Sequence, residues 1–347
     1  MRRPTAQDVA DLAGVSRSAV SLVLNGRAEG NIAPDKQKAI VQAAQRLSYR
    51  PNAVALSLRS QRTRTIGVLT WPNVAGPPAL ILRAALQAAT EAGYVLILMD
   101  TNGDQEVESH AVATLRDRQV EALLVIAPDL TNYRPTEAML SLPTILVNCA
   151  DPQASVTSVV PDEAGAGSAA ARILIDAGHS RIGLMAGPMD AVQTRLRVAG
   201  CHQVVAAADL DGRAQFIGSR SIASAAAAAH ALLEQTEPPT ALICTHERFA
   251  VGAALAAADL QLRIPDQLSL VSLEDGEQLA CQLAPPLTTV ERPDRPMADQ
   301  AVSMLVERLA SESREEPVKQ LLYICPPVHR DSVAAPSSLR QSASPSR

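Results

Sequence analysis

Near the start of the sequence, the stretch VSRSAVSLVLNGR (residues 15–27) gathers side chains whose types suit recognition chemistry. If this stretch is helical, its polar members and one leucine share a flank: Ser16, Arg17, Ser18, Ser21, Leu22 and Asn25. Short hydroxyls and a fork-shaped guanidinium suit the edges of base pairs, and a bidentate contact of Arg17 with guanine is worth about 1–3 kcal/mol of discrimination. The alternative is a surface amphipathic helix whose serines only cap its end.

Two short helices joined by a tight turn are predicted to position these side chains. Thr5 and Asp8 have the spacing of a capping pair, with Val9, Ala10, Leu12 and Ala13 as the apolar face before Gly14. Ser16 can cap the second helix, which ends at Asn25 and Gly26. A third helix is expected to begin near Pro34. The second helix of such a motif enters the major groove with its N-terminus first.

The charge distribution separates this head from the rest of the chain. Residues 1–64 hold 11 Lys and Arg against 4 Asp and Glu, a net charge of +7, and the remainder has a net charge of −12. A basic head on an acidic body predicts that the head meets a polyanion. This charge favours base readout over the capping-only alternative.

A marginal helix is predicted directly after the head. Asn52 can cap a short helix carrying Val54, Ala55 and Leu58, followed by a basic polar linker to residue 64. So short a helix is unstable alone in water, because nucleation costs more than a few hydrogen bonds return. We expect it to form only when something else stabilises it.

From Thr65 onward, short β-rich runs alternate with helical stretches, as in TIGVLT, YVLILMD, EALLVIA, PTILVN, RIGLMAG, TALICT, LSLVSL and LLYIC. Such alternation predicts an α/β body of parallel sheets covered by helices on both faces, and its length favours two successive doubly wound subdomains. The tail at 332–347 is rich in Ser, Pro and Ala and is expected to be disordered.

Several classes of protein are disfavoured. The opening MRRPTAQDVADLAGVS turns polar at once and no apolar run is long enough to span a bilayer, so we expect a cytoplasmic protein without a membrane partner. The five cysteines form no CxxC pair, which argues against a zinc or disulfide framework. GAGSAA at residues 165–170 imitates a dinucleotide fingerprint, but tight packing explains it better. There is no nucleophile elbow, paired-carboxylate motif or HExxH, so we expect no enzyme, no metal and no cofactor.

The segments TAQDVADLAGVSRSAVSLVLNG and LSYRPNAVALSLRSQRTRTIGVL resemble the head of the lactose-repressor (LacI/GalR) family of bacterial transcription regulators. TSVVPDEAG, LIDAGHSRIGLMAGP, RLRVAG, PTALICTHERFAVGA, PDQLSLVSLED, PPLTTVERP and VHRDS follow in the family's order, so the resemblance covers about residues 4–333. It implies an all-α helix-turn-helix domain at 1–51, a hinge helix and linker at 52–64, and an effector-binding and dimerisation domain at 65–331. The last has two subdomains of the periplasmic-binding-protein type, and the chain crosses between them near 162–165 and 291–296.

The resemblance assigns roles to individual residues of the head. Arg17, Ser18 and Leu22 match base-reading positions, and Thr5, Ser16, Ser21 and Asn25 match phosphate-contacting or supporting positions. Leu22 departs from the arginine of the founding member and can make only apolar contact, for example with a thymine methyl, so a different operator is expected. Ala33 replaces the usual serine cap of the third helix. In the hinge helix, Asn52, Ala55 and Leu58 are implied to contact DNA, with Leu58 as a wedge in the minor groove.

In the body, the resemblance implies a small ligand in the cleft between the subdomains. The implied cleft residues are Asn73, Asn148, Arg197, His246, Glu247, Glu274 and Arg292. The family usually has Asn-Asp at 246–247, Asp at 274, Gly at 272 and an aromatic pair near 78–79. Since these departures change the volume of the cleft and remove a stacking surface, the identity of the effector does not carry over.

The combined expectation is a homodimeric repressor that binds near-palindromic operator DNA and responds to a small effector, which we expect to be a sugar. Whether the effector releases DNA or promotes binding stays open, as do the operator sequence and any higher oligomer. The first alternative is a solute-binding protein without a DNA role, which needs an export signal and leaves the basic head unexplained. The second is a doubly wound enzyme, which needs a cofactor fingerprint or a catalytic constellation.

Overall fold

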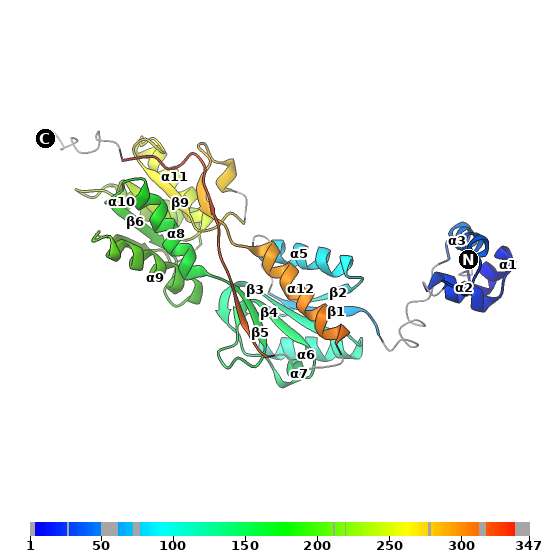
Figure 1. Ribbon diagram of the computed structural model, residues 1–347. Coiled ribbons are helices and arrows are strands. Elements are labelled where there is room, and N and C mark those ends of the chain that lie inside the picture. Colours follow the sequence, from blue (N-terminus) through cyan, green and yellow to red (C-terminus); the bar gives the residue numbers. More distant parts are fainter. Residues whose placement is uncertain are drawn as a thin grey trace. The chain divides into compact units, whose positions relative to one another are not determined.

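The computed structural model describes residues 4–25, 28–49, 62–71, 77–210, 212–218, 220–276, 279–311 and 317–336. The chain divides into two compact units, Met1–Arg64 and Thr65–Arg347 (Figure 1). Buried apolar side chains form separate clusters within each unit. The first unit is the head, and the second is the body.

Three helices form the described part of the head: α1 (Ala6–Ala13), α2 (Arg17–Leu24) and α3 (Pro34–Arg46). The predicted capping pair is present, since the Thr5 N–H donates to Asp8 Oδ2 at 2.7 Å and the Asp8 N–H donates to Thr5 Oγ1 at 3.3 Å. Gly14 ends α1 with a φ of 65°, a left-handed conformation that glycine adopts without steric cost. The start of α1 and the turn between α1 and α2 therefore depend on residues whose roles the sequence predicts.

The core of the head is small and aliphatic. Val9, Val20 and Ile40, one from each helix, are almost completely buried against one another. Leu12 was expected on the apolar face of α1, but it is 45% exposed. Ala33 precedes α3 without making a side-chain cap, as expected from its methyl group.

The body contains two parallel sheets with helices on both faces, as predicted. The first sheet has the order β11-β5-β4-β3-β1-β2, and all its strands run parallel. Its strands are β1 (Thr65–Thr70), β2 (Val95–Asp100), β3 (Ala122–Asn132), β4 (Thr144–Ala150), β5 (Thr157–Pro161) and β11 (Gln320–Tyr323). Helices α5 (Pro77–Glu91) and α12 (Asp294–Ala310) share one core with this sheet, and α6 (Gln105–Asp117) and α7 (Glu137–Leu140) share the other.

The second sheet repeats this plan with the order β12-β10-β9-β8-β6-β7, in which only β12 is antiparallel. Its strands are β6 (Ile182–Ala186), β7 (Gly212–Phe216), β8 (Ala241–Cys244), β9 (Ser269–Ser272), β10 (Thr288–Val290) and β12 (Pro327–Val328). Helices α8 (Glu163–Asp176) and α9 (Val192–Ala207) cover one face, and α10 (Ile222–Leu233) and α11 (Glu247–Asp259) cover the other. A short 3-10 helix, Ala280–Gln282, precedes β10.

The chain passes between the two sheets three times. It leaves β5 for α8 at residue 162, β10 for α12 at residues 291–293, and β11 for β12 at residues 324–326. The third passage was not predicted, because β12 is only two residues long and carries no alternating pattern.

The start of the tail is ordered, which corrects the prediction of disorder from residue 332. The Ser332 hydroxyl is buried, donates to the Leu270 carbonyl at 2.6 Å and accepts from the Thr288 N–H at 2.8 Å. Ser332 therefore connects the start of the tail to β9 and β10. The Ser- and Pro-rich composition of the tail does not predict these hydrogen bonds. Residues 337–347 lie outside the described residues.

The small residues of GAGSAA serve helix packing, as the sequence favoured. A Cβ added at Gly167 of α8 would lie 2.1 Å from the Arg197 carbonyl oxygen, and one at Gly200 of α9 would lie 1.9 Å from the Ala164 carbonyl oxygen. Two backbones approach closely at these glycines, which places Arg197 beside the start of α8. Within the described residues, no helix is long and apolar enough to cross a membrane.

Candidate functional site

In the head, the first turn of α2 presents its polar groups to solvent. Ser16, Arg17 and Ser18 are all exposed. The Ser16 hydroxyl caps α2 by accepting from the Ala19 N–H at 3.2 Å, and it lies 2.9 Å from the Ser18 hydroxyl. The capping interpretation of Ser16 is therefore correct, while Arg17 and Ser18 stay available on the surface of the same turn.

The end of α2 adds a second polar group and one unusual leucine. The Asn25 amide donates to the Ser21 carbonyl at 2.6 Å and to the Ser21 hydroxyl at 3.2 Å, so these residues support each other. Leu22 is half-buried but does not pack against the core, whereas its neighbours Val23 and Leu24 do. An apolar side chain outside the core on the polar flank of α2 suits the proposed contact with a base.

Four predicted site residues lie outside the described residues: Asn52, Ala55, Leu58 and Asn73. Their roles remain predictions.

In the body, a buried ionic cluster lies where the second sheet meets α8 and α9. Arg197 of α9, only 2% exposed, donates to both Glu163 carboxylate oxygens, at 2.5 Å from Nε and 3.0 Å from Nη2. Its Nη1 donates to Glu274 Oε1 at 2.8 Å and also to the Thr245 carbonyl. Burial opposes the charge on Arg197, but Glu163 and Glu274 outweigh it and raise the pKa of the guanidinium. Arg197 thus joins α8, α9 and the loop after β9.

Glu274 is the centre of this cluster. Its Oε1 accepts from Gln193 Nε2 at 3.2 Å as well as from Arg197, and its Oε2 lies 3.3 Å from His246 Nε2. Burial disfavours the charged carboxylate, but the interactions with His246 and with the guanidinium groups of Arg197 and Arg292 outweigh it and lower its pKa to about 2. The group is therefore ionised at every physiological pH.

His246 and Glu247 also have structural tasks. His246 caps α11, because its Nδ1 accepts from the Arg248 N–H at 3.2 Å. With Nδ1 accepting, Nε2 carries the proton that faces Glu274. Glu247 is fully buried and accepts from the Ala280 N–H at 2.6 Å, which ties α11 to the 3-10 helix.

Asn148 and Arg292 each keep one unsatisfied polar atom. Asn148, within β4, has a φ of 59°, donates to the Ala127 carbonyl at 3.0 Å and leaves Oδ1 buried without a partner. Arg292 is paired with Asp294 through Nε at 2.5 Å and Nη2 at 3.2 Å, and its Nη1 is buried without a partner. Because such an atom costs about 1–3 kcal/mol when it stays unpaired, both residues are suited to accept a ligand.

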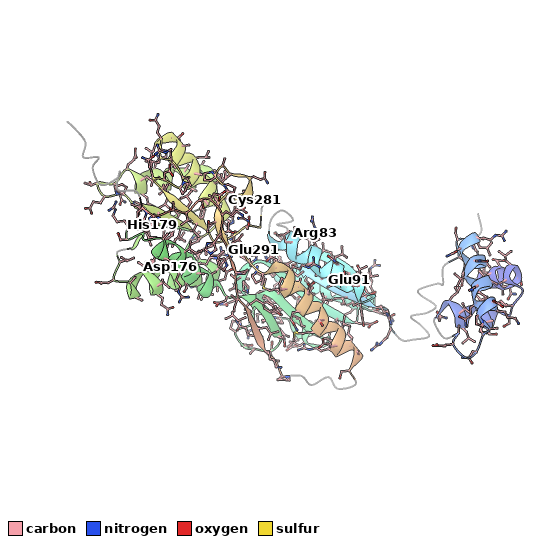
Figure 2. All side chains as sticks on the ribbon, turned by 45° about the horizontal axis from the view of Figure 1, so that its top comes forward. Arg83, Glu91, Asp176, His179, Cys281 and Glu291 are labelled. Atoms are coloured by element: carbon pink, nitrogen blue, oxygen red, sulfur yellow. The ribbon has the colours of Figure 1, made fainter. Side chains whose placement is uncertain are left out.

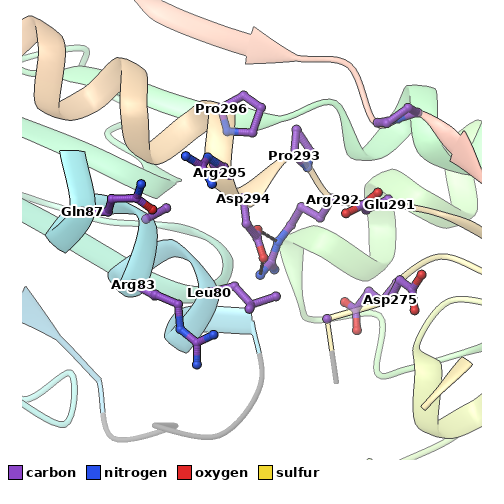
Figure 3. A pocket seen from close by; sticks show the side chains of 14 residues that line it. Leu80, Arg83, Gln87, Asp275, Glu291, Arg292, Pro293, Asp294, Arg295 and Pro296 are labelled. Atoms are coloured by element: carbon purple, nitrogen blue, oxygen red, sulfur yellow. Dashed lines mark hydrogen bonds and ion pairs between the residues drawn. The ribbon is translucent and has the colours of Figure 1, made fainter. Parts of the chain in front are cut away.

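A pocket of about 410 Å³ is lined by two of the predicted residues, Glu274 and Arg292. Figure 3 shows Arg292 in this pocket. Its other walls come from α5, the loop after β9, the start of α12 and two of the passages between the sheets: Leu80, Arg83, Ala84, Gln87, Asp275, Gly276, Glu291, Pro293, Asp294, Arg295, Pro296 and Pro326. Asn148, Arg197, His246 and Glu247 do not line this pocket. Glu274 therefore belongs to both the buried cluster and the pocket, Arg292 lines the pocket, and the other described residues of the predicted cleft lie outside it.

An ion pair also joins the two subdomains. Arg220, before α10, lies 2.7 Å from Asp129 of β3, measured from Nη2 to Oδ2. Arg220 is close enough to Glu274 to help lower the pKa of that carboxyl. The pair therefore links the two subdomains beside the buried cluster.

Sequence reasoning missed several residues of this region, of which Glu163, Asp275 and Asp294 are the clearest. Glu163 stands in PDEAG, and Asp275 and Asp294 each follow a predicted residue by one or two positions. Acids placed directly after the carboxyl ends of predicted strands were the signal that could have found them. No group of three or more His, Cys, Asp or Glu within the described residues is arranged to hold a metal ion.

A head whose described residues form three helices with an exposed polar turn, followed in the chain by two parallel-sheet subdomains with a pocket between them, is typical of DNA-binding transcription regulators. Residues 5–52 match the family described as bacterial regulatory proteins, lacI family, and residues 171–333 match a periplasmic binding protein-like domain.

Full-length relatives agree with this class. The chain is 31% identical to the HTH-type transcriptional repressor PurR of Aliivibrio fischeri strain MJ11, over 91% of this chain and 95% of that protein. It is 29% identical to PurR of Aliivibrio salmonicida, over 91% of this chain and 96% of that protein.

Solved structures agree as well. The lac repressor dimer bound to operator and the anti-inducer ONPF has a TM-score of 0.77 at 25% identity, covering 96% of this chain and all of that chain. The complex of the regulator CelR with cellobiose has a TM-score of 0.66 at 26% identity, covering 95% of this chain and all of that chain. The chain belongs to the lacI family and is a DNA-binding transcriptional repressor.

Proposed function

We propose that this repressor binds a near-palindromic operator as a homodimer, and that a small carbohydrate bound between the subdomains controls its affinity for DNA. In this proposal residues 1–51 bind DNA, residues 52–64 transmit the signal, and residues 65–331 bind the effector and dimerise. The observation that carries it is the exposed first turn of α2, with Arg17 and Ser18 on the surface of a well-capped helix-turn-helix. The cellobiose complex of CelR supports a carbohydrate ligand.

Two halves of a palindrome need two heads related by a two-fold axis. Exposed apolar side chains on α5 and on the edge strand β2 support a self-association surface in the body. They are Leu86, Val95 and Leu98, of which Val95 is 64% exposed. Burying such side chains between two copies would remove apolar area from water and stabilise a dimer.

Control of DNA affinity requires that the effector bind the two states of the repressor with different affinity. The ion pair between Asp129 and Arg220 joins the subdomains, so a ligand that changes their separation would break or tighten it. We propose that this movement changes the spacing of the two linkers and so orders or melts the hinge helices. Leu58, carried over from the family resemblance, would then lose its position in the minor groove.

Selection of binding sites from random duplexes tests the DNA-binding part. Arg17→Ala should relax the consensus at one position of each half-site, because a bidentate contact worth about 1–3 kcal/mol is lost. Arg46→Ala, which removes an exposed charge at the end of α3, is the matched control and should leave the consensus unchanged. An unchanged consensus for Arg17→Ala would refute its role in base readout.

Leu58→Ala tests the hinge. It should weaken operator binding far more than effector binding, whereas equal loss of both in titrations would contradict the hinge account.

A further inference from the structure

The pocket between α5 and the passages has a charge pattern that bears on its ligand. Figure 3 shows Arg83, Gln87 and Arg295 on one side and Asp275 and Glu291 on the other. Arg292 and Asp294 stand between the two sides, and Figure 2 shows Arg83 and Glu291 in the context of the whole body. A pocket with cations on one wall and acids on the other favours a ligand that is itself polarised.

Most of the acids are already neutralised by partners. Asp294 is paired with Arg292, Asp275 with Arg330, and Glu274 with Arg197. Burial and the neighbouring carboxylates Asp275 and Asp294 raise the pKa of Glu291, so this group takes up a proton more readily than an ordinary glutamate. The acidic lining therefore repels an anion less than its residue types suggest.

The basic side of the pocket has hydrogen-bond donors that are available to a ligand. Arg292 is only 6% exposed, yet its Nη1 has no hydrogen-bond partner. Arg295 is exposed, and its ion pair with Asp299, 3.6 Å from Nε to Oδ2, is too long for a hydrogen bond. The N-terminus of α12 has no side-chain cap and adds partial positive charge beside Arg295. An anionic group placed here would satisfy the buried guanidinium nitrogen.

The opposite wall needs a hydrogen-bond donor. Asp275 Oδ1 is buried without a partner, since the contact with Arg330 uses Oδ2. A hydroxyl group can donate to this oxygen. Among the described lining residues there is no aromatic side chain on which a planar ring could stack, which disfavours a nucleobase.

We propose that the effector is an acidic carbohydrate, a sugar acid or a sugar phosphate. Its anionic group faces Arg83, Arg292 Nη1 and Arg295, and its hydroxyls face Asp275 and Glu291. This inference rests on the proposed carbohydrate effector and narrows it to one charge class.

Isothermal titration of the full-length repressor with matched ligands tests the proposal. The panel pairs each neutral hexose or pentose with its aldonic acid, its uronic acid and its terminal phosphate, beginning with glucose, gluconate, glucuronate and glucose 6-phosphate. We expect at least one acid or phosphate to bind about tenfold or more tightly than its neutral parent, the gain expected from one charge-assisted contact. Comparison of the sugar acids with the sugar phosphates shows whether the anionic group of the effector is a carboxylate or a phosphate.

Arg83→Gln tests the role of a pocket arginine. Arg116→Gln, on the exposed surface of α6, is the matched control. Arg83→Gln should weaken the anionic ligand about tenfold and leave its neutral parent unchanged, because only the charge is removed. The proposal of an acidic effector would be overturned if neutral sugars bound as tightly as their acids and phosphates. It would also be overturned if Arg83→Gln and Arg116→Gln had equal effects on the anionic ligand. Either result would leave the proposal of a carbohydrate effector standing. A repressor that binds its operator but no carbohydrate of either charge would overturn both ligand proposals and leave DNA binding untouched.

Discussion

The buried cluster around Arg197 makes a strong prediction about stability. Arg197→Met keeps most of the side-chain volume but leaves Glu163 and Glu274 without their shared cation in the protein interior. Breaking a buried ion pair in this way costs about 3–5 kcal/mol of unfolding free energy. At roughly 2–4 °C per kcal/mol for a domain of this size, the melting temperature of the body should fall by roughly 6–20 °C.

The loss should depend on pH with a defined sign. Glu274 has a pKa of about 2 in the folded protein against an ordinary value of 4.5, so its ionisation stabilises the fold above pH 4.5, by about 3 kcal/mol, and this contribution disappears as the pH falls toward 2. Without Arg197 the pKa of Glu274 in the folded state is higher. The difference between wild type and variant should therefore be largest above pH 4.5 and shrink in acid.

Urea unfolding followed by circular dichroism at several pH values measures both effects. Arg172→Met is the matched control, because Arg172 is exposed on α8, the helix that carries Glu163. It should change the unfolding free energy by no more than about 0.5 kcal/mol. Equal losses for the two variants, or a loss for Arg197→Met that does not vary with pH, would refute the reasoning.

Four further predictions follow from single features. Gly200→Ala should destabilise the body strongly, since its Cβ would meet the backbone of α8 at 1.9 Å, and thermal melting checks this. Thr5→Ala should destabilise the head by about 1 kcal/mol in urea unfolding, because the capping box is lost. Only Cys281 should react rapidly with a thiol reagent at pH 8, because it is exposed while burial raises the pKa of the other four thiols. Asp129→Asn and Arg220→Gln should change effector affinity to a similar extent, with little further change in the double variant, and additive effects would contradict their pairing.

The sequence was most informative where structure depends on neighbouring residues. Thr5 with Asp8, Gly14 and Ser16 lie within a few positions of the groups they bond, so the caps and the turn of the head were readable. The alternation of apolar runs and helices indicated two parallel sheets for the same reason. Leu12 was misassigned because periodicity does not tell how far a small core reaches around a helix.

Contacts between residues that are distant in the sequence could not be predicted from local spacing and periodicity. Family resemblance pointed to Arg197 and Glu274, but it did not indicate that Glu163 satisfies the same guanidinium from 34 residues away. The order of Ser332 likewise depends on Leu270 and Thr288, which belong to other strands.

By itself, the sequence determined that this chain has a basic helix-turn-helix head and an α/β body of two subdomains, because local spacing and periodicity encode both. Only the tertiary structure decided which predicted cleft residues are used within the protein and which face a pocket. Arg197 is paired with buried carboxylates, whereas Arg292 lines the pocket with one nitrogen that has no partner. The physical reason is that the pairing of charges depends on distances between side chains that are far apart in the sequence. A local sequence pattern does not predict those distances.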